Sequence, residues 1–99
     1  MITVKVDKSI FFDEITLTVE DAGFIPSAND IKELSLRLNS NNIRIKKAFE
    51  CTYHLADWYV CDKRKLSDIA DFIDYDEIAN WLLADGNYVE LESGHIVLF

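Results

Sequence analysis

The sequence has little glycine and proline, three residues and one residue respectively among 99, and it has no long apolar run. No stretch approaches the ~20 apolar residues of a membrane-spanning helix. The scattered glycines exclude the glycine-rich loops that hold phosphates or dinucleotides. The start, MITVKVDKSIFF, has no apolar region before a small-residue cleavage site, so we predict no secretory signal. Because 49% of the residues are hydrophobic, we expect one globular domain, residues 1–99. Without an apolar span or a secretory signal, we expect this domain in the cytoplasm and without membrane contact.

Cysteine is also sparse, with Cys51 and Cys61 only. If one helix carries both residues, they lie ~15 Å apart, whereas a disulfide requires Cα atoms within roughly 7 Å. We therefore expect two reduced thiols, as in a reducing compartment.

Basic residues are absent from the last third of the chain. Residues 1–65 carry ten acidic and ten basic side chains, whereas residues 66–99 carry eight acidic side chains and no Lys or Arg. The net charge of −8 therefore arises entirely after residue 65. Such an asymmetry indicates an interaction surface rather than uniform solubilisation.

Residues 1–42 predict an antiparallel β-pair followed by a helix. ITVKV and EITLTV alternate apolar and polar residues, which is the pattern of half-buried strands. EDAGFIP is a connector punctuated by Gly23 and Pro26. Ser27 is a good N-cap, Asp30 follows near the positive end of the helix dipole, and apolar residues recur at helical spacing through Leu38. NSNN then ends the helix.

Residues 43–60 are compatible with either a helix or a strand. IRIKKAFECTYHLADWYV places apolar residues on one helical face, but positions 49, 51, 53 and 55 also follow a period of two. Eighteen residues without glycine or proline favour a helix, which we predict over residues 44–60.

Residues 67–85 predict two short helices. Ser67 is placed to cap the first helix, which ends at Ile73. Asp74 and Glu77 make the capping-box pattern of a second helix over residues 75–85.

The chain ends in a predicted β-hairpin. Gly86 or Asn87 can take the left-handed position after the helix. YVELE and HIVLF then flank Ser93-Gly94, which is a hairpin turn by composition. These elements together predict an α+β fold, with an N-terminal antiparallel β-pair plus helix (residues 1–42), then helices and a C-terminal β-hairpin (residues 43–99).

The order of the later elements resembles the winged helix-turn-helix family, with helices over 44–60, 67–73 and 75–85 before a two-stranded wing at 88–92 and 95–99. The residues that carry the likeness fit an L-x-x-[IL]-A core helix and a glycine before the wing: Leu66, Ile69, Ala70, Ile73, Leu82, Gly86 and the terminal YVELESGHIVLF. The link after Ile73 is shorter than the family usually has. The resemblance implies a winged-helix-like second half, with residues 75–85 in the position of the DNA-recognition helix.

This implied recognition helix, YDEIANWLLAD, is poorly suited to DNA. DNA affinity comes mostly from phosphate neutralisation by Lys and Arg, and base readout commonly uses Arg or Lys on guanine. Asn80 is the only residue of the helix suited to base readout, and His95 is the only cation that the wing offers. We therefore do not expect direct DNA binding through this face.

We expect this acidic surface to bind a basic protein surface instead. A surface of one sign steers oppositely charged partners, such as the nucleic-acid groove of an enzyme. Most aromatic residues should enter the core, but the helix cannot bury Trp81 and Leu83 together with Ile78 and Leu82, which leaves an anchor for a partner. The predicted partner-binding residues are Asp68, Asp71, Asp74, Asp76, Glu77, Trp81, Leu83, Asp85, Glu90 and Glu92.

Small acidic inhibitors from phages and mobile elements, such as anti-restriction and anti-CRISPR proteins, are similar to this chain in size and charge. This likeness in composition implies a DNA mimic without enzymatic activity. Such a protein is an inhibitor or adaptor that occupies the nucleic-acid-binding surface of its partner.

Three alternatives stay open. The chain is alternatively a structural subunit of a larger assembly, or its acids only keep it soluble and stabilise helix N-termini. A third alternative is a winged-helix transcription regulator, and a homodimer is compatible with each reading. The regulator would touch DNA through two basic clusters: Arg44, Lys46 and Lys47, and Lys63, Arg64 and Lys65.

No arrangement of residues predicts an enzyme, a metal site or a cofactor. Cys51 and His54 lie three residues apart. Asp57 or Cys61 would supply at most a doubtful third or fourth ligand, whereas structural zinc needs four. Nothing marks an oxyanion hole for a Cys–His pair, and we expect His95 to be exposed in the wing turn.

Overall fold

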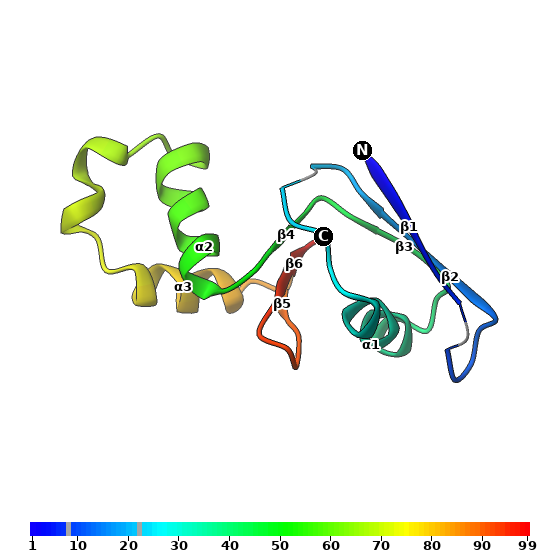
Figure 1. Ribbon diagram of the computed structural model, residues 1–99. Coiled ribbons are helices and arrows are strands. Elements are labelled where there is room, and N and C mark those ends of the chain that lie inside the picture. The colour runs from blue at the N-terminus through cyan, green and yellow to red at the C-terminus, as the bar shows by residue number, and fades with distance from the viewer. Residues whose placement is uncertain (8, 22) are drawn as a thin grey trace.

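The structure, a computed structural model, describes residues 1–7, 9–21 and 23–99. It confirms the α+β class, with an N-terminal β-pair, helices and a C-terminal β-hairpin. Figure 1 shows one sheet with helix α1 at one end, a second sheet in the middle and the other helices at the far end. The elements are β1 (Ile2–Asp7), β2 (Glu14–Val19), α1 (Ala28–Leu38), β3 (Asn42–Ile45), β4 (Lys47–Phe49), α2 (Thr52–Asp57), η1 (Trp58–Lys63), η2 (Ser67–Phe72), α3 (Tyr75–Leu83), β5 (Tyr88–Glu90) and β6 (Ile96–Leu98).

The N-terminal sheet has the strand order β1-β2-β3. β1 and β2 are antiparallel, with Ile2 opposite Val19, as their alternating sequences predict. Helix α1 separates β2 from β3 in the chain and allows β3 to run parallel to β2. The core between sheet and helix is formed by alternate residues of β2 and one face of α1: Ile15, Leu17, Val19, Ile31 and Leu34.

Helix α1 begins at the predicted Ser27 cap. The Ser27 hydroxyl accepts a hydrogen bond from the Asp30 backbone N–H, and the Asp30 carboxylate accepts one from the Ser27 N–H. This capping box satisfies two backbone donors that would otherwise lack partners. Asn39 ends the helix in the left-handed conformation, with φ of 49°, which asparagine tolerates better than most residues.

The predicted helix over residues 44–60 is wrong in its first part. β3 and β4 occupy residues 42–49, and the helix begins at Thr52. Ile43 and Ile45 are buried on either side of an exposed residue, so the alternation of β-branched side chains outweighs the helical pattern. In a helix, the backbone N–H and C=O groups of these residues would bond to one another. Here they bond instead to β2 and β6, so they are also satisfied in the strands.

β3 and β4 form one bent strand that is shared by two sheets. On the N-terminal side, the Asp21 N–H donates to the Lys46 carbonyl at 2.8 Å. On the other side, the Lys46 N–H donates to the Leu98 carbonyl at 2.7 Å. Lys46 is therefore the point at which the strand changes sheets.

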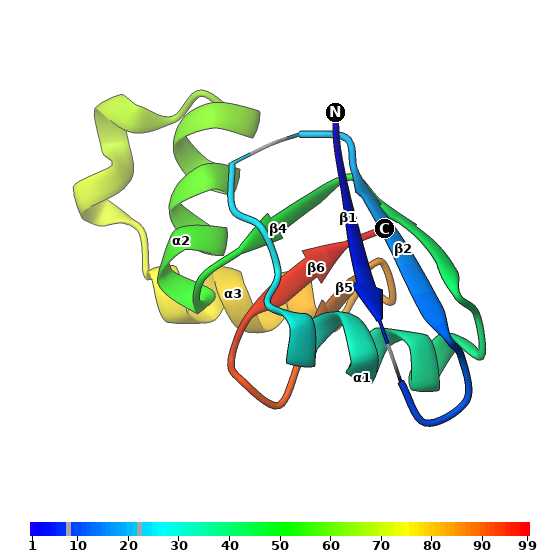
Figure 2. The ribbon, with the colours of Figure 1, turned by 45° about the vertical axis from the view of Figure 1, so that its right-hand side comes forward.

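The second sheet, in the order β4-β6-β5, separates two hydrophobic cores. Successive side chains of a strand point to opposite faces. Ala48 and Val97 accordingly enter the core of the N-terminal sheet and α1, whereas Phe49, Ile96 and Leu98 enter the core of the helices. All three residues of β6 are buried. Figure 2 shows β6 between the helices α2 and α3 and the N-terminal half.

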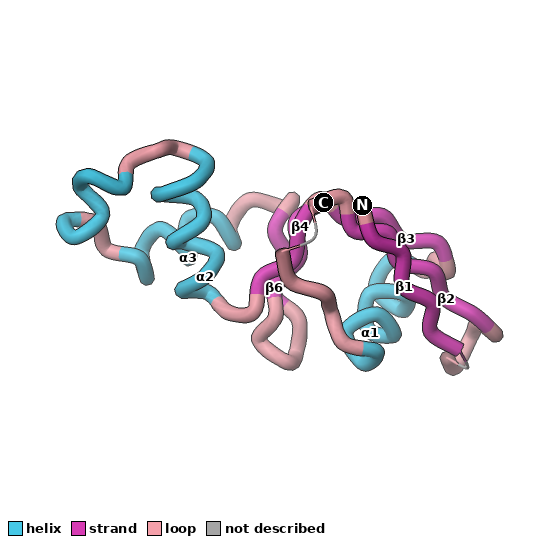
Figure 3. Tube along the Cα trace, turned by 45° about the horizontal axis from the view of Figure 1, so that its top comes forward, coloured by secondary structure: helices cyan, strands magenta, loops and turns pink. Residues whose placement is uncertain are grey.

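The helical half contains α, π and 3-10 helices, which Figure 3 shows as a group apart from the strands. α2 continues directly into the π-helical η1, where the Arg64 N–H donates to the carbonyl of Tyr59, five residues earlier. Lys65 follows with φ of 55°, a left-handed conformation that is uncommon outside glycine. This reversal leads the chain into the 3-10 helix η2.

One of the two predicted caps in this half is confirmed. The Asp74 carboxylate accepts hydrogen bonds from the backbone N–H groups of Asp76 and Glu77 and caps α3. Ser67 is not a cap, because it is the first residue of η2 and Leu66 occupies the cap position.

The predicted turns also differ in outcome. α3 ends at Leu83, its C-cap residue Ala84 is right-handed, and neither Gly86 nor Asn87 becomes left-handed. The Ser93-Gly94 hairpin turn is confirmed, since Gly94 has φ of 91°, which favours glycine.

The molecule is elongated, with extents of 48 × 23 × 18 Å. Among the described residues, no helix has the length and apolar character needed to cross a membrane. Cys51 and Cys61 are both free thiols, as predicted.

We expect the two cores to unfold together, because β6 belongs to both. Leu17→Ala removes a fully buried side chain from the N-terminal core and should lower the free energy of unfolding by about 2–5 kcal/mol. Trp58 and Trp81 both lie in the helical half, yet their fluorescence in a urea titration should report this loss. Phe11→Ala, at a side chain 72% exposed, should change the free energy of unfolding by less than about 0.5 kcal/mol. An unchanged tryptophan transition in Leu17→Ala would show that the halves unfold independently.

Candidate functional site

The eight acidic residues after residue 65 are all exposed, but they fall into two regions. Three follow α3 in the chain, at its end and in the hairpin: Asp85, Glu90 and Glu92. The other five lie on η2 and at the start of α3: Asp68, Asp71, Asp74, Asp76 and Glu77. We call residues 66–77 the acidic end.

The acidic end also exposes apolar side chains. Phe72 is 88% exposed, and Leu66 and Ile69 are 40% and 47% exposed. Residues three apart in a 3-10 helix share a face, which places Ile69 beside Phe72. No residue of η2 is buried, over a segment that the structure describes completely. The helix that the winged-helix resemblance places in the core instead lies outside both hydrophobic cores.

The two predicted apolar anchors differ in exposure. Trp81 is 62% exposed and lies edge-to-face on Tyr59, with ring centroids 5.6 Å apart. A hollow of about 290 Å³ adjoins it at the C-terminal end of α3. Leu83 is half-buried against the helical core. Trp81 is therefore the more accessible of the two.

A buried carboxylate attaches the hairpin turn to helix α1. Asp30 accepts a hydrogen bond from the Ser93 hydroxyl at 2.6 Å, and its other oxygen lies 2.6 Å from His95 Nδ1. One turn along α1, the Glu33 carboxylate accepts a hydrogen bond from the Glu92 backbone N–H at 3.0 Å. The hairpin turn is therefore fixed to the N-terminal half and does not extend the acidic end.

Asp30 is held in its ionised form. Burial alone would raise the pKa of its carboxyl, but hydrogen bonds from Ser93, His95 and Ser27 outweigh burial and hold this pKa below its usual 3.8. The prediction of an exposed His95 is wrong, because its side chain is 25% exposed and its ring lies edge-to-face on Phe24. Its partner Asp30 is 65 residues away in the sequence, which no local pattern reveals.

This Asp–His–Ser group does not form an activated nucleophile. In serine hydrolases the hydroxyl contacts the imidazole, whose other nitrogen contacts the carboxylate. Here the Ser93 hydroxyl donates directly to Asp30, so the carboxylate anchors it. In the described part of the chain, no three potential metal ligands come together.

The two basic clusters are partly neutralised. Arg44 Nε lies 2.9 Å from a carboxylate oxygen of Glu20, and Lys47 Nζ lies 3.2 Å from one of Asp21. The first cluster, Arg44, Lys46 and Lys47, lies on the bent strand β3–β4. The second cluster begins with Lys63, the last residue of η1, and continues to Lys65. The remaining basic side chains of the clusters are exposed: Lys46, Lys63, Arg64 and Lys65.

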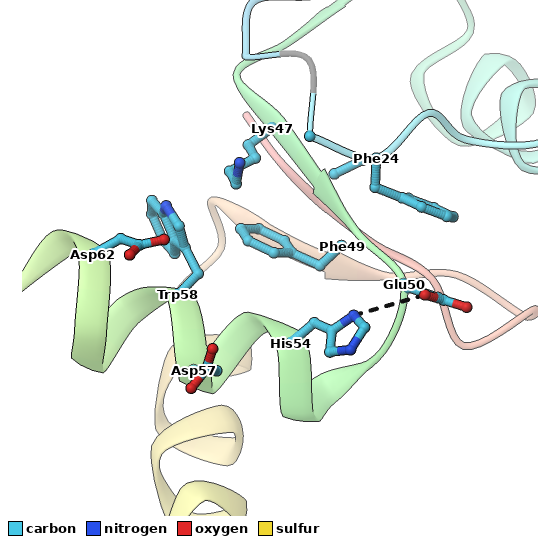
Figure 4. A pocket seen from close by; sticks show the side chains of 10 residues that line it. Phe24, Lys47, Phe49, Glu50, His54, Asp57, Trp58 and Asp62 are labelled. Atoms are coloured by element: carbon cyan, nitrogen blue, oxygen red, sulfur yellow. Dashed lines mark ion pairs between the residues drawn. The ribbon is translucent and has the colours of Figure 1, made fainter. Parts of the chain in front are cut away.

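A cavity of about 380 Å³ lies between β4 and one face of α2–η1. Figure 4 shows Phe49 and Trp58 next to each other in it, with Lys47, Phe24 and His54 around them. Sequence reasoning missed this cavity because its strand side was predicted as part of the helix over residues 44–60.

A polar cluster near this cavity joins α2 and η1 to α3. The Tyr75 hydroxyl donates to the Asp57 carboxylate at 3.1 Å, and Cys61 Sγ donates to the same oxygen at 3.6 Å. Hydrogen bonding with Cys61, burial and the bond to Asp57 raise the pKa of the Tyr75 hydroxyl above its usual value. Tyr75 therefore stays protonated at neutral pH and can keep donating to Asp57.

Comparisons with protein families, curated proteins and solved structures found no match for this chain. Its function must be inferred from its own residues. Two surface features are candidate binding sites: the acidic end with its exposed Phe72, and the cavity beside Trp58.

We expect Asp30→Asn to lower the free energy of unfolding at pH 7 by about 1–3 kcal/mol, because the amide cannot accept all of the buried hydrogen bonds. Since the folded state lowers the pKa of Asp30, its ionisation contributes stability above pH 3.8, and this contribution is lost as pH falls through the folded-state pKa. Urea titrations of wild type and Asp30→Asn should therefore converge in acid. Asp71→Asn, at an exposed carboxylate, is the control and should match wild type throughout. A pH-independent deficit in Asp30→Asn would contradict the assignment.

Proposed function

We propose that this protein acts by protein contact, without enzymatic activity, and that its acidic end occupies a basic, nucleic-acid-binding surface of a partner. The observation that carries the proposal is the composition of η2. This helix exposes Ile69 and Phe72 between Asp68, Asp71 and Asp74, and it buries none of its own residues. An inhibitor or adaptor of the kind found in phages would use such a surface.

An exposed apolar centre with an acidic border suits a protein interface. Aromatic residues are enriched in interface centres and often supply much of the binding energy, whereas charged residues border them. Phe72 is the natural anchor of the acidic end, and Trp81 on α3 offers a second exposed aromatic side chain.

The charge of this region supports a cationic partner. Residues 66–99 carry no Lys or Arg, so every charged side chain of the acidic end is negative. A surface of one sign accelerates association with an oppositely charged groove. The same surface disfavours the phosphates of DNA.

The winged-helix resemblance remains part of the proposal. A helical segment over residues 52–63, a short helix, helix α3 and a hairpin follow one another in the expected order. A DNA-binding regulator would have to use the exposed members of the basic clusters, since Arg44 and Lys47 pair with acids. The two free thiols support the proposed cytoplasmic location.

We expect a protein from nuclease-treated lysate of the source cells to be retained by immobilised wild type at about 150 mM salt. Phe72→Ser removes the anchor and should weaken this binding by ~2 kcal/mol or more, about thirtyfold. Asp68→Lys/Asp71→Lys reverses two exposed charges and should abolish retention. Titration of the purified partner by calorimetry measures both losses. Asp74 is left intact in these variants because it caps α3.

Matched controls lie at the opposite end of the molecule, in and beside the β1–β2 loop (Figure 1). Phe11→Ser changes another highly exposed phenylalanine, 72% exposed against 88% for Phe72, and Asp7→Lys/Asp13→Lys makes the same change in net charge. Both controls should retain the partner. Equal retention by all variants, or loss confined to the controls, contradicts a function of the acidic end. If wild type instead forms a concentration-dependent dimer and Phe72→Ser is monomeric, this surface binds a second copy of the chain.

A further inference from the structure

The cavity of about 380 Å³ between β4 and α2–η1 has the size of a small ligand site. Ligand pockets span roughly 300–1,000 Å³, so this one suits a side chain rather than a large cofactor. One wall comes from β4, the opposite wall from residues of α2–η1 at helical spacing, and the rim from Gly23 and Phe24. Gly23 lets the Lys47 ammonium approach closely, because a Cβ there would lie 2.8 Å from Lys47 Nζ.

Aromatic rings form the centre of the cavity. The ring centroids of Phe49 and Trp58 are 5.1 Å apart, with the planes inclined by 52°. Each ring already lies beside an ammonium group of the chain: Lys47 Nζ is 5.8 Å from the Phe49 centroid, and Lys63 Nζ is 5.7 Å from the Trp58 centroid. Phe49 is 3% exposed, so the ring that a cation from outside can reach is that of the half-buried Trp58, where it would compete with Lys63.

The charges around the rings also favour a cation. Three carboxylates line the cavity: Glu50, Asp57 and Asp62. Its one lining lysine, Lys47, is paired with Asp21 at 3.2 Å. Asp57 already accepts a hydrogen bond from Tyr75. Glu50 and Asp62 are exposed, on β4's C-terminal side and on η1 respectively, so they can accept further hydrogen bonds.

We propose that this cavity binds a guanidinium group, supplied by an arginine side chain of a partner protein. A guanidinium is planar, stacks on aromatic faces and donates in a fork to carboxylates, and it loses less hydration than an ammonium. Trp58 supplies the aromatic face, with the buried Phe49 packed against it, and Asp62 supplies an exposed carboxylate beside Trp58 (Figure 4). The inference does not rest on the proposed function, since none of these residues belongs to the acidic end.

N-acetylarginine amide is the probe, titrated into the full-length protein at pH 7.5 and followed through the indole N–H resonances in NMR spectra. Saturable shifts are expected at Trp58, with Trp81 unmoved as an internal reference. N-acetylcitrulline amide has the same shape without the charge and should bind about tenfold more weakly. N-acetyllysine amide should also bind more weakly, because it lacks the planar fork. Equal binding of either control, or equal shifts at both tryptophans, overturns the assignment.

Two single variants should move the affinity in opposite directions. Asp62→Asn removes an exposed carboxylate of the cavity and should weaken arginine binding about tenfold. Lys63→Gln removes the ammonium that competes for the face of Trp58 and should tighten binding about twofold or more. Asp71→Asn makes the same change as Asp62→Asn on η2 and should leave affinity unchanged. If Asp62→Asn binds like wild type, the proposal is wrong, whatever the acidic end binds.

Discussion

Strand β6 is the element on which both halves of the molecule depend. It is the middle strand of the second sheet and is buried on both faces, so its alternate side chains enter two different cores. The helices after β4 have no other sheet to cover, and Leu55 and Leu82 pack against Ile96 and Leu98. The pairing of β6 with β5 is local, but its pairing with β4 joins segments that lie far apart in the sequence. Folds of this kind pay loop-closure entropy before these contacts form.

The hairpin that supplies β6 is also tied to the N-terminal half. Asp30 holds Ser93 and His95, and Glu33 holds the Glu92 backbone. Asp30 serves two structures at once, because the same carboxylate completes the capping box of α1. A buried ionised group is stable only where hydrogen bonds replace its hydration. Here the cap, the hydroxyl and the imidazole replace it, and they fix the orientation of hairpin and helix.

This arrangement leaves helix η2 of the acidic end outside both hydrophobic cores. Both cores are complete without η2, whose apolar side chains remain in solvent. Several basic residues are instead engaged within the molecule: Arg37 with Glu33, Arg44 with Glu20, and Lys47 with Asp21. The acidic end, by contrast, carries exposed carboxylates and no Lys or Arg, and we propose a cationic partner for both this end and the cavity. The acidic end projects and the cavity is recessed, so the two would bind different parts of such a partner.

Interactions that span a few residues could be read directly from the sequence. The alternation in β1 and β2, the Ser27 and Asp74 caps and the Ser93-Gly94 turn depend on neighbours within one turn or one strand. The α+β class and the charge asymmetry follow from such local patterns and from composition. The course of residues 42–49 does not, because pairing with β2 and β6 overrides their helical pattern. The partial burial of His95, the exposure of Phe72 and the cavity between β4 and Trp58 likewise arise from the packing of distant segments. A carboxylate 65 residues away decides the environment of a histidine, and no local pattern in the sequence shows that the two side chains meet.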